Sequence, residues 1–94
     1  MKYPPIQNYI AGSFVSASID TVMPVISPLD GTILSTVPMS AIKDLDQAVE
    51  AAKKAFPSWS NTPIKERVQV FFRYKTLLEK NLKMLAELCS EENG

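Results

Sequence analysis

Two consecutive helical stretches near the end of the chain are apolar over more of their circumference than one packing partner can cover. Thr62-Pro63 predicts a helix start, because a capping residue precedes a proline that suits the first helical position. On a wheel of about 100° per residue, the apolar positions span an arc of roughly 200°, about twice what a surface helix needs. These positions are Ile64, Val68, Val70, Phe71, Phe72, Tyr74, Leu77 and Leu78.

Two charged residues, Arg67 and Lys75, interrupt this first arc, and we expect them to snorkel or to form ion pairs. A second stretch, which follows Asn81, is also apolar over a wide arc. Asn81 either caps a further helix or marks a bend, and the apolar positions after it are Leu82, Met84, Leu85, Ala86, Leu88 and Cys89. A chain of 94 residues cannot cover both arcs, so Phe72 and Tyr74 should stay exposed. We therefore expect a piece of a larger protein, or packing against a second copy.

An amphipathic helix is predicted ahead of these two. Ser40 is a suitable N-cap. Apolar residues then recur at spacings of three and four, at Ile42, Leu45, Val49, Ala52 and Phe56. Pro57 should end this helix and push Phe56 out of the α region, so that Phe56 and Trp59 fold back over the helix end.

The first 39 residues favour short strands and turns. Residues 1–7 should form a loose arm, because Tyr3-Pro4-Pro5 favours extended backbone and cannot begin a helix interior. Gly12-Ser13 separates two short β-prone runs and predicts a two-residue hairpin turn. Residues 21–27 should form an edge strand because Pro24 donates no ladder hydrogen bond.

A second turn and strand follow. Residues 28–31 predict a turn at Asp30-Gly31, and residues 32–37 form the best strand candidate, which Pro38 should end or bulge. The expected fold class is an α+β fragment, with short N-terminal strands and three helices; the family resemblance described below implies that it belongs to a larger α/β fold. We expect one partial domain over residues 1–94, with strands and turns in 1–39 and helices in 40–94.

Composition excludes several functions. Ten basic and ten acidic residues cancel, which disfavours nucleic acid or an anionic membrane as partner. Histidine is absent, and a single cysteine permits no internal disulfide, as suits a reducing compartment. No stretch resembles a signal peptide or a membrane helix, so we expect a cytoplasmic protein.

For each candidate catalytic residue, a structural role is the better interpretation. Cys89 has no histidine to activate it and lies on an apolar helical face, so we expect a buried core residue. Asp44, Asp46 and Glu50 should lie on a solvated, charged face rather than form an acid–base pair. The glycines are too scattered to cradle phosphate. We therefore predict no catalytic and no cofactor-binding residue in this chain.

Five motifs, in order and at matching spacing, carry a family resemblance. They are Asn8–Val15, Ile26–Gly31, Asp46–Val49 with Ala55–Trp59, Leu77–Asn81, and Glu92–Gly94. The chain resembles the N-terminal segment of the NAD(P)-dependent aldehyde dehydrogenase superfamily, and Arg67 falls where that family usually has an arginine. Arg73-Tyr74-Lys75, with Asn81-Leu82-Lys83, leans toward the methylmalonate-semialdehyde dehydrogenase branch.

The resemblance implies a parent enzyme of several domains, in which this segment belongs to the dinucleotide-binding domain. The parent would be a homo-oligomer that uses NAD or NADP to oxidise a small aldehyde, which in the branch named above is methylmalonate semialdehyde. A cysteine thioester would then be released to water or to coenzyme A. The catalytic residues of the family would lie after Gly94, and Cys89 does not fall in the nucleophile motif. The chain's main partner would be the rest of its parent.

Two details concern the turn motif. Ser27 stands where the family usually has asparagine, so a side-chain hydrogen bond that holds the turn should be weaker. Some family members bind a monovalent cation through backbone oxygens just before this turn. The resemblance therefore makes Val25 and Ile26 the candidate metal ligands.

Two other classes remain open from the residues alone. One is a stand-alone helical module that binds a partner protein through its wide apolar arcs. The other is a small structural domain that associates with itself.

Overall fold

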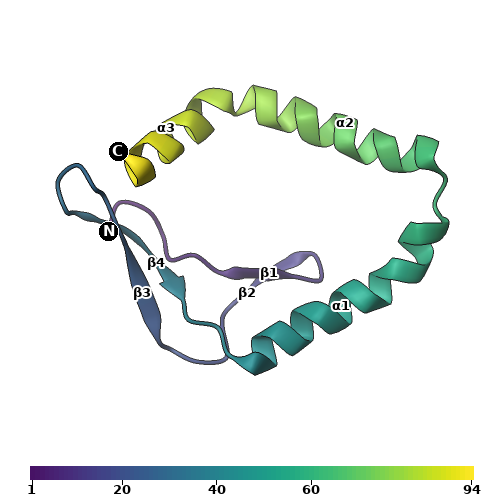
Figure 1. Cartoon of the computed structure of the whole chain (residues 1–94), viewed down its shortest axis with the longest axis horizontal. Coiled ribbons are helices and arrows are strands. Elements are labelled where there is room, and N and C mark those ends of the chain that lie inside the picture. The colour runs from purple at the N-terminus through teal and green to yellow at the C-terminus, as the bar shows by residue number, and fades with distance from the viewer.

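A computed structural model describes all 94 residues as two β-hairpins followed by three helices (Figure 1). The strands are β1 (Asn8–Ile10), β2 (Ser13–Val15), β3 (Val22–Ile26) and β4 (Ile33–Pro38). The helices are α1 (Ile42–Asn61), α2 (Ile64–Lys80) and α3 (Leu82–Asn93). The two hairpins form separate antiparallel sheets. The predicted α+β arrangement, strands first and helices after, is confirmed.

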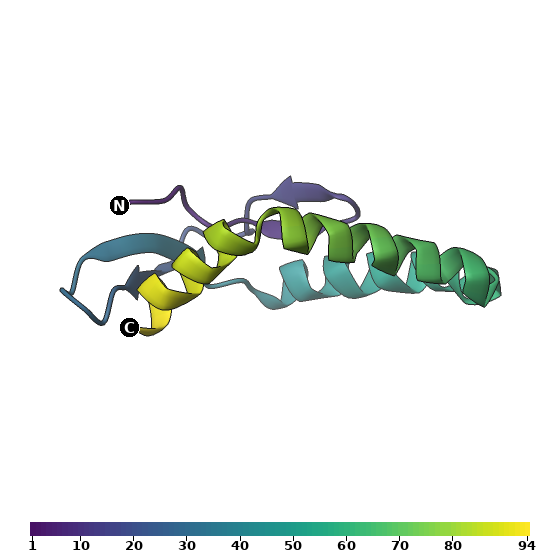
Figure 2. The ribbon, with the colours of Figure 1, turned by 90° about the horizontal axis from the view of Figure 1, so that it is seen from above.

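The elements lie in a flat, open frame. Its extents are 48 × 35 × 16 Å, and the view from above shows how thin it is (Figure 2). A single helix with its side chains is already about 10–12 Å thick, so there is little room for two packed layers. A folded monomer of 10.4 kDa exposes about 5,400 Å² by the usual scaling, whereas this chain exposes 7715 Å².

The hydrophobic core is correspondingly small. Four residues are buried, and Leu34 is the one apolar residue among them; the others are Ser27, Ser35 and Asp44. Phe72 and Tyr74 on α2 are 58% and 59% exposed. The expectation that the helical arcs exceed what this chain can cover is confirmed.

The first hairpin turns one residue earlier than predicted. Ala11 and Gly12 form the turn, with φ of 52° and 82°, and Ser13 already pairs with Ile10. Two successive positive φ values match the twist of the flanking strands, as type I′ turns do. Tyr9 and Phe14 pair across the strands with ring centroids 5.0 Å apart. The hairpin lies against α1 and meets its alanine-rich face, which is formed by Ala48, Ala51, Ala52 and Ala55.

The second hairpin accommodates two prolines. Pro24 pairs with Thr36 and Pro38 with Val22, and Pro38 is the last residue of β4, so it ends the strand as predicted. The backbone hydrogen bond from Met39 to Thr21 makes the next pair, Val22 with Pro38, a non-hydrogen-bonded one. Hydrogen-bonded and non-hydrogen-bonded pairs alternate along the two strands, so the pair of Pro24 with Thr36 is also non-hydrogen-bonded. The ladder therefore needs no N–H from either proline.

The N-terminal arm is docked, which corrects the prediction of a loose segment. The Tyr3 N–H donates to the Leu34 carbonyl at 2.8 Å, and the Ile6 N–H donates to the Thr36 carbonyl at 2.9 Å. The Ser35 hydroxyl donates to the Pro4 carbonyl at 2.7 Å. Leu34 has no partner in β3 because the register shifts at that point. The arm therefore uses acceptors on β4 that its ladder leaves open.

The start of α1 depends on Asp44 and not on Ser40, which corrects two predictions. Ala41 is the N-cap, and its N–H donates to Oδ2 of Asp44 at 2.8 Å. Asp44 also accepts from the Ser18 N–H and hydroxyl, at 2.9 and 2.8 Å. Asp44 is therefore buried and fully partnered instead of solvated. Ser40 hydrogen-bonds the Asn8 side chain instead.

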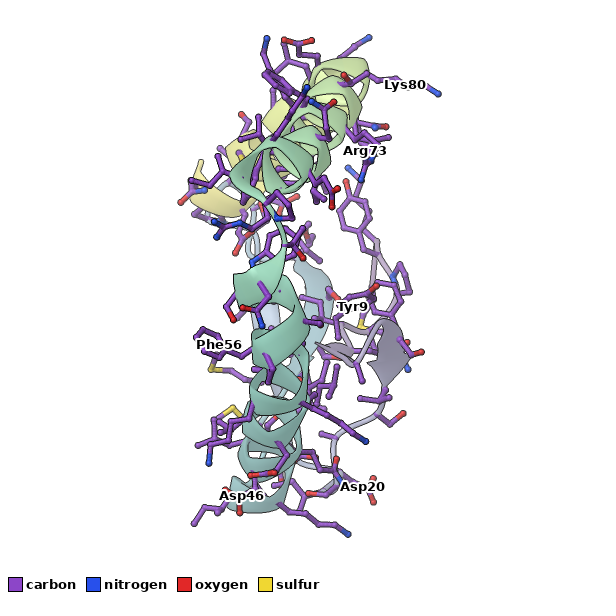
Figure 3. The ribbon with its side chains drawn as sticks, turned by 90° about the vertical axis from the view of Figure 1, so that its right-hand side faces the viewer. Tyr9, Asp20, Asp46, Phe56, Arg73 and Lys80 are labelled. Atoms are coloured by element: carbon purple, nitrogen blue, oxygen red, sulfur yellow. The ribbon has the colours of Figure 1, made fainter.

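Helix α1 runs through Pro57 to Asn61, so the predicted stop is wrong and Phe56 is helical. A proline here removes one backbone hydrogen bond, in the last turns of a long helix. The hydroxyls of Ser58, Ser60 and Thr62 then donate to carbonyls of this end at 3.2, 3.0 and 2.8 Å. Phe56 projects from the side of α1 opposite to Tyr9 and stays exposed (Figure 3).

Thr62 closes α1 and does not cap α2, whose N-cap is Pro63. Asn81 forms the junction between α2 and α3, where the ribbon bends (Figure 1). Its side-chain amide donates to the Leu77 carbonyl at 2.8 Å. Gly94 caps α3 as predicted, with φ of 78° and an N–H that donates to Ser90 at 2.9 Å.

Candidate functional site

The proposed cation ligands lie where the second hairpin becomes irregular. Val25 pairs with Ser35 and Ile26 with Ile33, so the register shifts between these two residues. Val25 is half-buried and Ile26 is exposed. No cluster of three metal-binding side chains exists in the chain. A site here would therefore depend on backbone oxygens, as the sequence prediction assumed.

The adjoining turn is held by short-range hydrogen bonds. Ser27 Oγ accepts from the Leu29 N–H at 3.3 Å, a long contact that agrees with a weak turn bond from serine. The Asp30 carboxylate accepts from the Thr32 N–H at 3.0 Å and from its hydroxyl at 2.7 Å. These two bonds hold the pKa of Asp30 below its usual value. Gly31 takes φ of 75°, as a left-handed turn position requires.

A polar cluster links the N-terminal arm to α3. Lys2 forms an ion pair with Oε1 of Glu91, and the Tyr3 hydroxyl donates to Oε2 of Glu91 at 2.6 Å. The hydrogen bond from Lys2 and then that from Tyr3 lower the pKa of Glu91. The hydrogen bond to Glu91 raises the pKa of both Lys2 and Tyr3. Beside this cluster lies an apolar recess of about 570 Å³, which the arm, Leu34 and Leu88 line.

A second recess lies at the corner between α1 and α2. It has a volume of about 360 Å³ and is lined by Trp59, Ile64, Arg67, Val68 and Phe71. The Nε atom of Arg67 is shielded from solvent and has no hydrogen-bond acceptor. Such a buried, unpartnered N–H costs about 1–3 kcal/mol. Lys75, the other charge in the α2 arc, pairs with Glu79 at 3.4 Å as predicted.

The residues considered for catalysis are dispersed. Cys89 is exposed, which corrects the prediction of a buried core residue, and no side chain hydrogen-bonds its sulfur. Gly12 and Gly31 lie in hairpin turns and Gly94 ends α3. No glycine therefore precedes a helix N-terminus, where a dinucleotide's phosphates would bind. No helix is both long and apolar enough to span a membrane.

Sequence reasoning missed the partners of two acidic side chains. The signal for Asp44 was weak but present, because an acidic residue at the third helical position can reach back to the N-cap N–H. The contact between Tyr3 and Glu91 had no local signal, since the two residues are 88 positions apart.

Comparisons with known proteins cover nearly the whole chain. The profile of the aldehyde dehydrogenase family matches residues 14–94. The chain belongs to the aldehyde dehydrogenase family. Malonate-semialdehyde dehydrogenase 1 of Geobacillus kaustophilus is 42% identical over 95% of the chain, and malonate-semialdehyde dehydrogenase of Bacillus pumilus is 40% identical over the same share. The match confirms the resemblance to aldehyde dehydrogenases described above.

A solved structure supports the same conclusion. It is a Sinorhizobium meliloti protein with a methylmalonate-semialdehyde dehydrogenase assignment, in complex with NAD. It matches 98% of the chain with a TM-score of 0.89 and 35% identity. The chain spans 18% of that protein and 18% of each of the two curated relatives. The family fold around these residues is therefore much larger than the chain.

Proposed function

We propose that this chain is the N-terminal segment of an NAD(P)-dependent aldehyde dehydrogenase, in which it is a scaffold. The observation that carries the proposal is the match of 95% of the chain to only 18% of a relative that is 42% identical. The flat frame supports the proposal, because apolar surface of this extent normally packs against another domain or another protein. On this proposal residues 1–94 are the first part of the dinucleotide-binding domain.

The relatives' names support a substrate class for the parent. Those relatives are malonate-semialdehyde dehydrogenases, and the solved structure carries a methylmalonate-semialdehyde assignment. We propose that the parent oxidises an aldehyde of this class. The catalytic and cofactor-binding residues would be supplied by the rest of the parent. The proposal includes a cytoplasmic, homo-oligomeric parent.

A chimera tests the proposal. It joins this chain to Geobacillus kaustophilus malonate-semialdehyde dehydrogenase 1 in place of the segment it matches. We expect a soluble enzyme that reduces NAD when malonate semialdehyde is supplied. The 94-residue chain alone should show no such activity. An insoluble or inactive chimera, or aldehyde oxidation by the chain alone, would contradict the proposal.

The backbone oxygens of Val25 and Ile26 are proposed as monovalent cation ligands within the parent. The irregular register at this point supports the proposal, because it makes backbone groups available outside the ladder. Crystals of the chimera soaked with Tl⁺ should show an anomalous peak beside these oxygens. Packed side chains in place of a cation at that position would contradict the proposal.

The exposed apolar arcs also favour a second candidate, a domain that associates with itself or with another protein. Sedimentation of the isolated chain separates the two. A folded homodimer favours the self-associating domain, whereas partial folding or aggregation favours the segment of a larger enzyme.

A further inference from the structure

The recess at the corner between α1 and α2 combines apolar walls with one unpartnered hydrogen-bond donor. Trp59, Ile64, Val68 and Phe71 line it together with Arg67. The Arg67 Nε is shielded from solvent without an acceptor, although buried polar groups in folded proteins nearly always have one. The acceptor for this atom is therefore expected from outside these 94 residues.

The chain's own acidic residues do not supply it. All four ion pairs of the structure use lysines, namely Lys2, Lys53, Lys75 and Lys83. Arg67 takes part in none of them. A guanidinium is a rigid, planar donor that is always charged, and its geometry matches a carboxylate. Charge and shape together favour an acidic side chain over a neutral acceptor.

We infer that Arg67 anchors a carboxylate side chain from the remainder of the parent enzyme, which enters the recess between α1 and α2. This inference rests on the proposed function. The remainder is favoured over a second copy because the chain spans only 18% of the matched solved structure, with a TM-score of 0.89. The same frame therefore occurs inside a larger chain. A carboxylate side chain would pair with Arg67, and an apolar residue beside it would pack against the apolar walls of the recess.

The chimera described above tests the inference through Arg67→Gln and Arg67→Lys, with Lys65→Gln as the control. Lys65 lies two positions before Arg67, does not line the recess and is exposed. We expect Arg67→Gln to lower the melting temperature by several degrees, because the buried carboxylate loses its partner. Arg67→Lys should recover part of the loss, and Lys65→Gln should change little.

The crystal structure of the chimera identifies the occupant directly. A carboxylate of the same subunit within hydrogen-bond distance of Arg67 Nε supports the inference. Replacing that acid by its amide should then cost no further stability once Arg67 is glutamine. A backbone carbonyl, a water, or a residue of another subunit at Nε would overturn it, as would an unchanged melting temperature of Arg67→Gln.

The two proposals fail differently. An active chimera that does not respond to Arg67→Gln contradicts only the anchoring role of Arg67. An unmutated chimera that is insoluble or inactive contradicts the proposed function, and with it the inference that depends on it.

Discussion

The Tyr3 hydroxyl donates a hydrogen bond to Oε2 of Glu91 at 2.6 Å and so joins residues 88 positions apart. Lys2 pairs with the other oxygen of the same carboxylate. Together these contacts close the frame, because they connect the arm on β4 to the last helix. The remaining restraints on the arm are a few hydrogen bonds to β4.

Docking of the arm should depend on pH at both extremes. The pKa of Glu91 lies below its ordinary value of 4.5, so its contribution is present above pH 4.5 and is lost as the pH falls through the lowered pKa. The pKa values of Tyr3 and Lys2 are raised above 10.0 and 10.5, so their contribution is lost as the pH rises through those raised values. The protection factor of the Ile6 amide in the chimera, which removes the intrinsic pH dependence of exchange, should fall at both ends.

The matched variants are Glu91→Gln and Glu92→Gln in the chimera. Glu91→Gln should accelerate exchange of Ile6 at neutral pH severalfold and remove the acidic transition, because the ion pair with Lys2 is lost. The Glu92 side chain forms no hydrogen bond or ion pair, so Glu92→Gln should behave like the unmutated chimera. Equal exchange of the Ile6 amide in both variants would show that the contacts of Glu91 with Lys2 and Tyr3 do not hold the arm.

Asp44 should matter more to stability than its neighbouring carboxylates. Asp44→Ala removes the acceptor for the Ala41 N–H and for both donors of Ser18, and leaves these groups without a partner. We expect a lower melting temperature of the chimera by several degrees. The control is Asp46→Ala, at an exposed position of the same helix, which should change it little. A similar response of both variants would contradict the capping role.

Pro57→Ala should stabilise α1. The helix already runs through this position, so alanine restores the backbone N–H without changing the fold. We expect a gain of about 1–3 kcal/mol, measured by denaturant unfolding of the chimera. A loss of stability would mean that the proline sets a bend on which packing depends. Ser58→Ala, which removes an exposed hydroxyl bond to Ala55 in the same turn, provides a control that should change stability little.

Ala11→Gly should also be stabilising. Ala11 is the one residue other than glycine with positive φ, at 52°. An L side chain in that region costs about 1–2 kcal/mol, part of which glycine recovers against its larger entropy loss. We expect a net gain of about 0.5–1 kcal/mol in the same unfolding assay. Gly12→Ala, at φ of 82°, should act in the reverse sense.

The residues themselves determined the order and type of the elements. Period-two and period-3.6 patterns, the Asp30-Gly31 turn and the Gly94 cap are local signals, and neighbouring residues are enough to produce them. The width of the apolar arcs also followed from local spacing, and with it the exposure of Phe72 and Tyr74. The five motifs placed the chain in its family for the same reason.

Tertiary structure decided the features that depend on partners distant in sequence. The arm is ordered because β4 and Glu91 offer acceptors that no local pattern announces. Asp44 is buried because Ser18 lies across from it, and only the folded chain brings them together. Pro57 does not end α1, so the local cost of its lost backbone hydrogen bond is outweighed in the folded 20-residue helix. Local propensities act over a few residues, whereas these outcomes depend on contacts that exist only after the chain has folded.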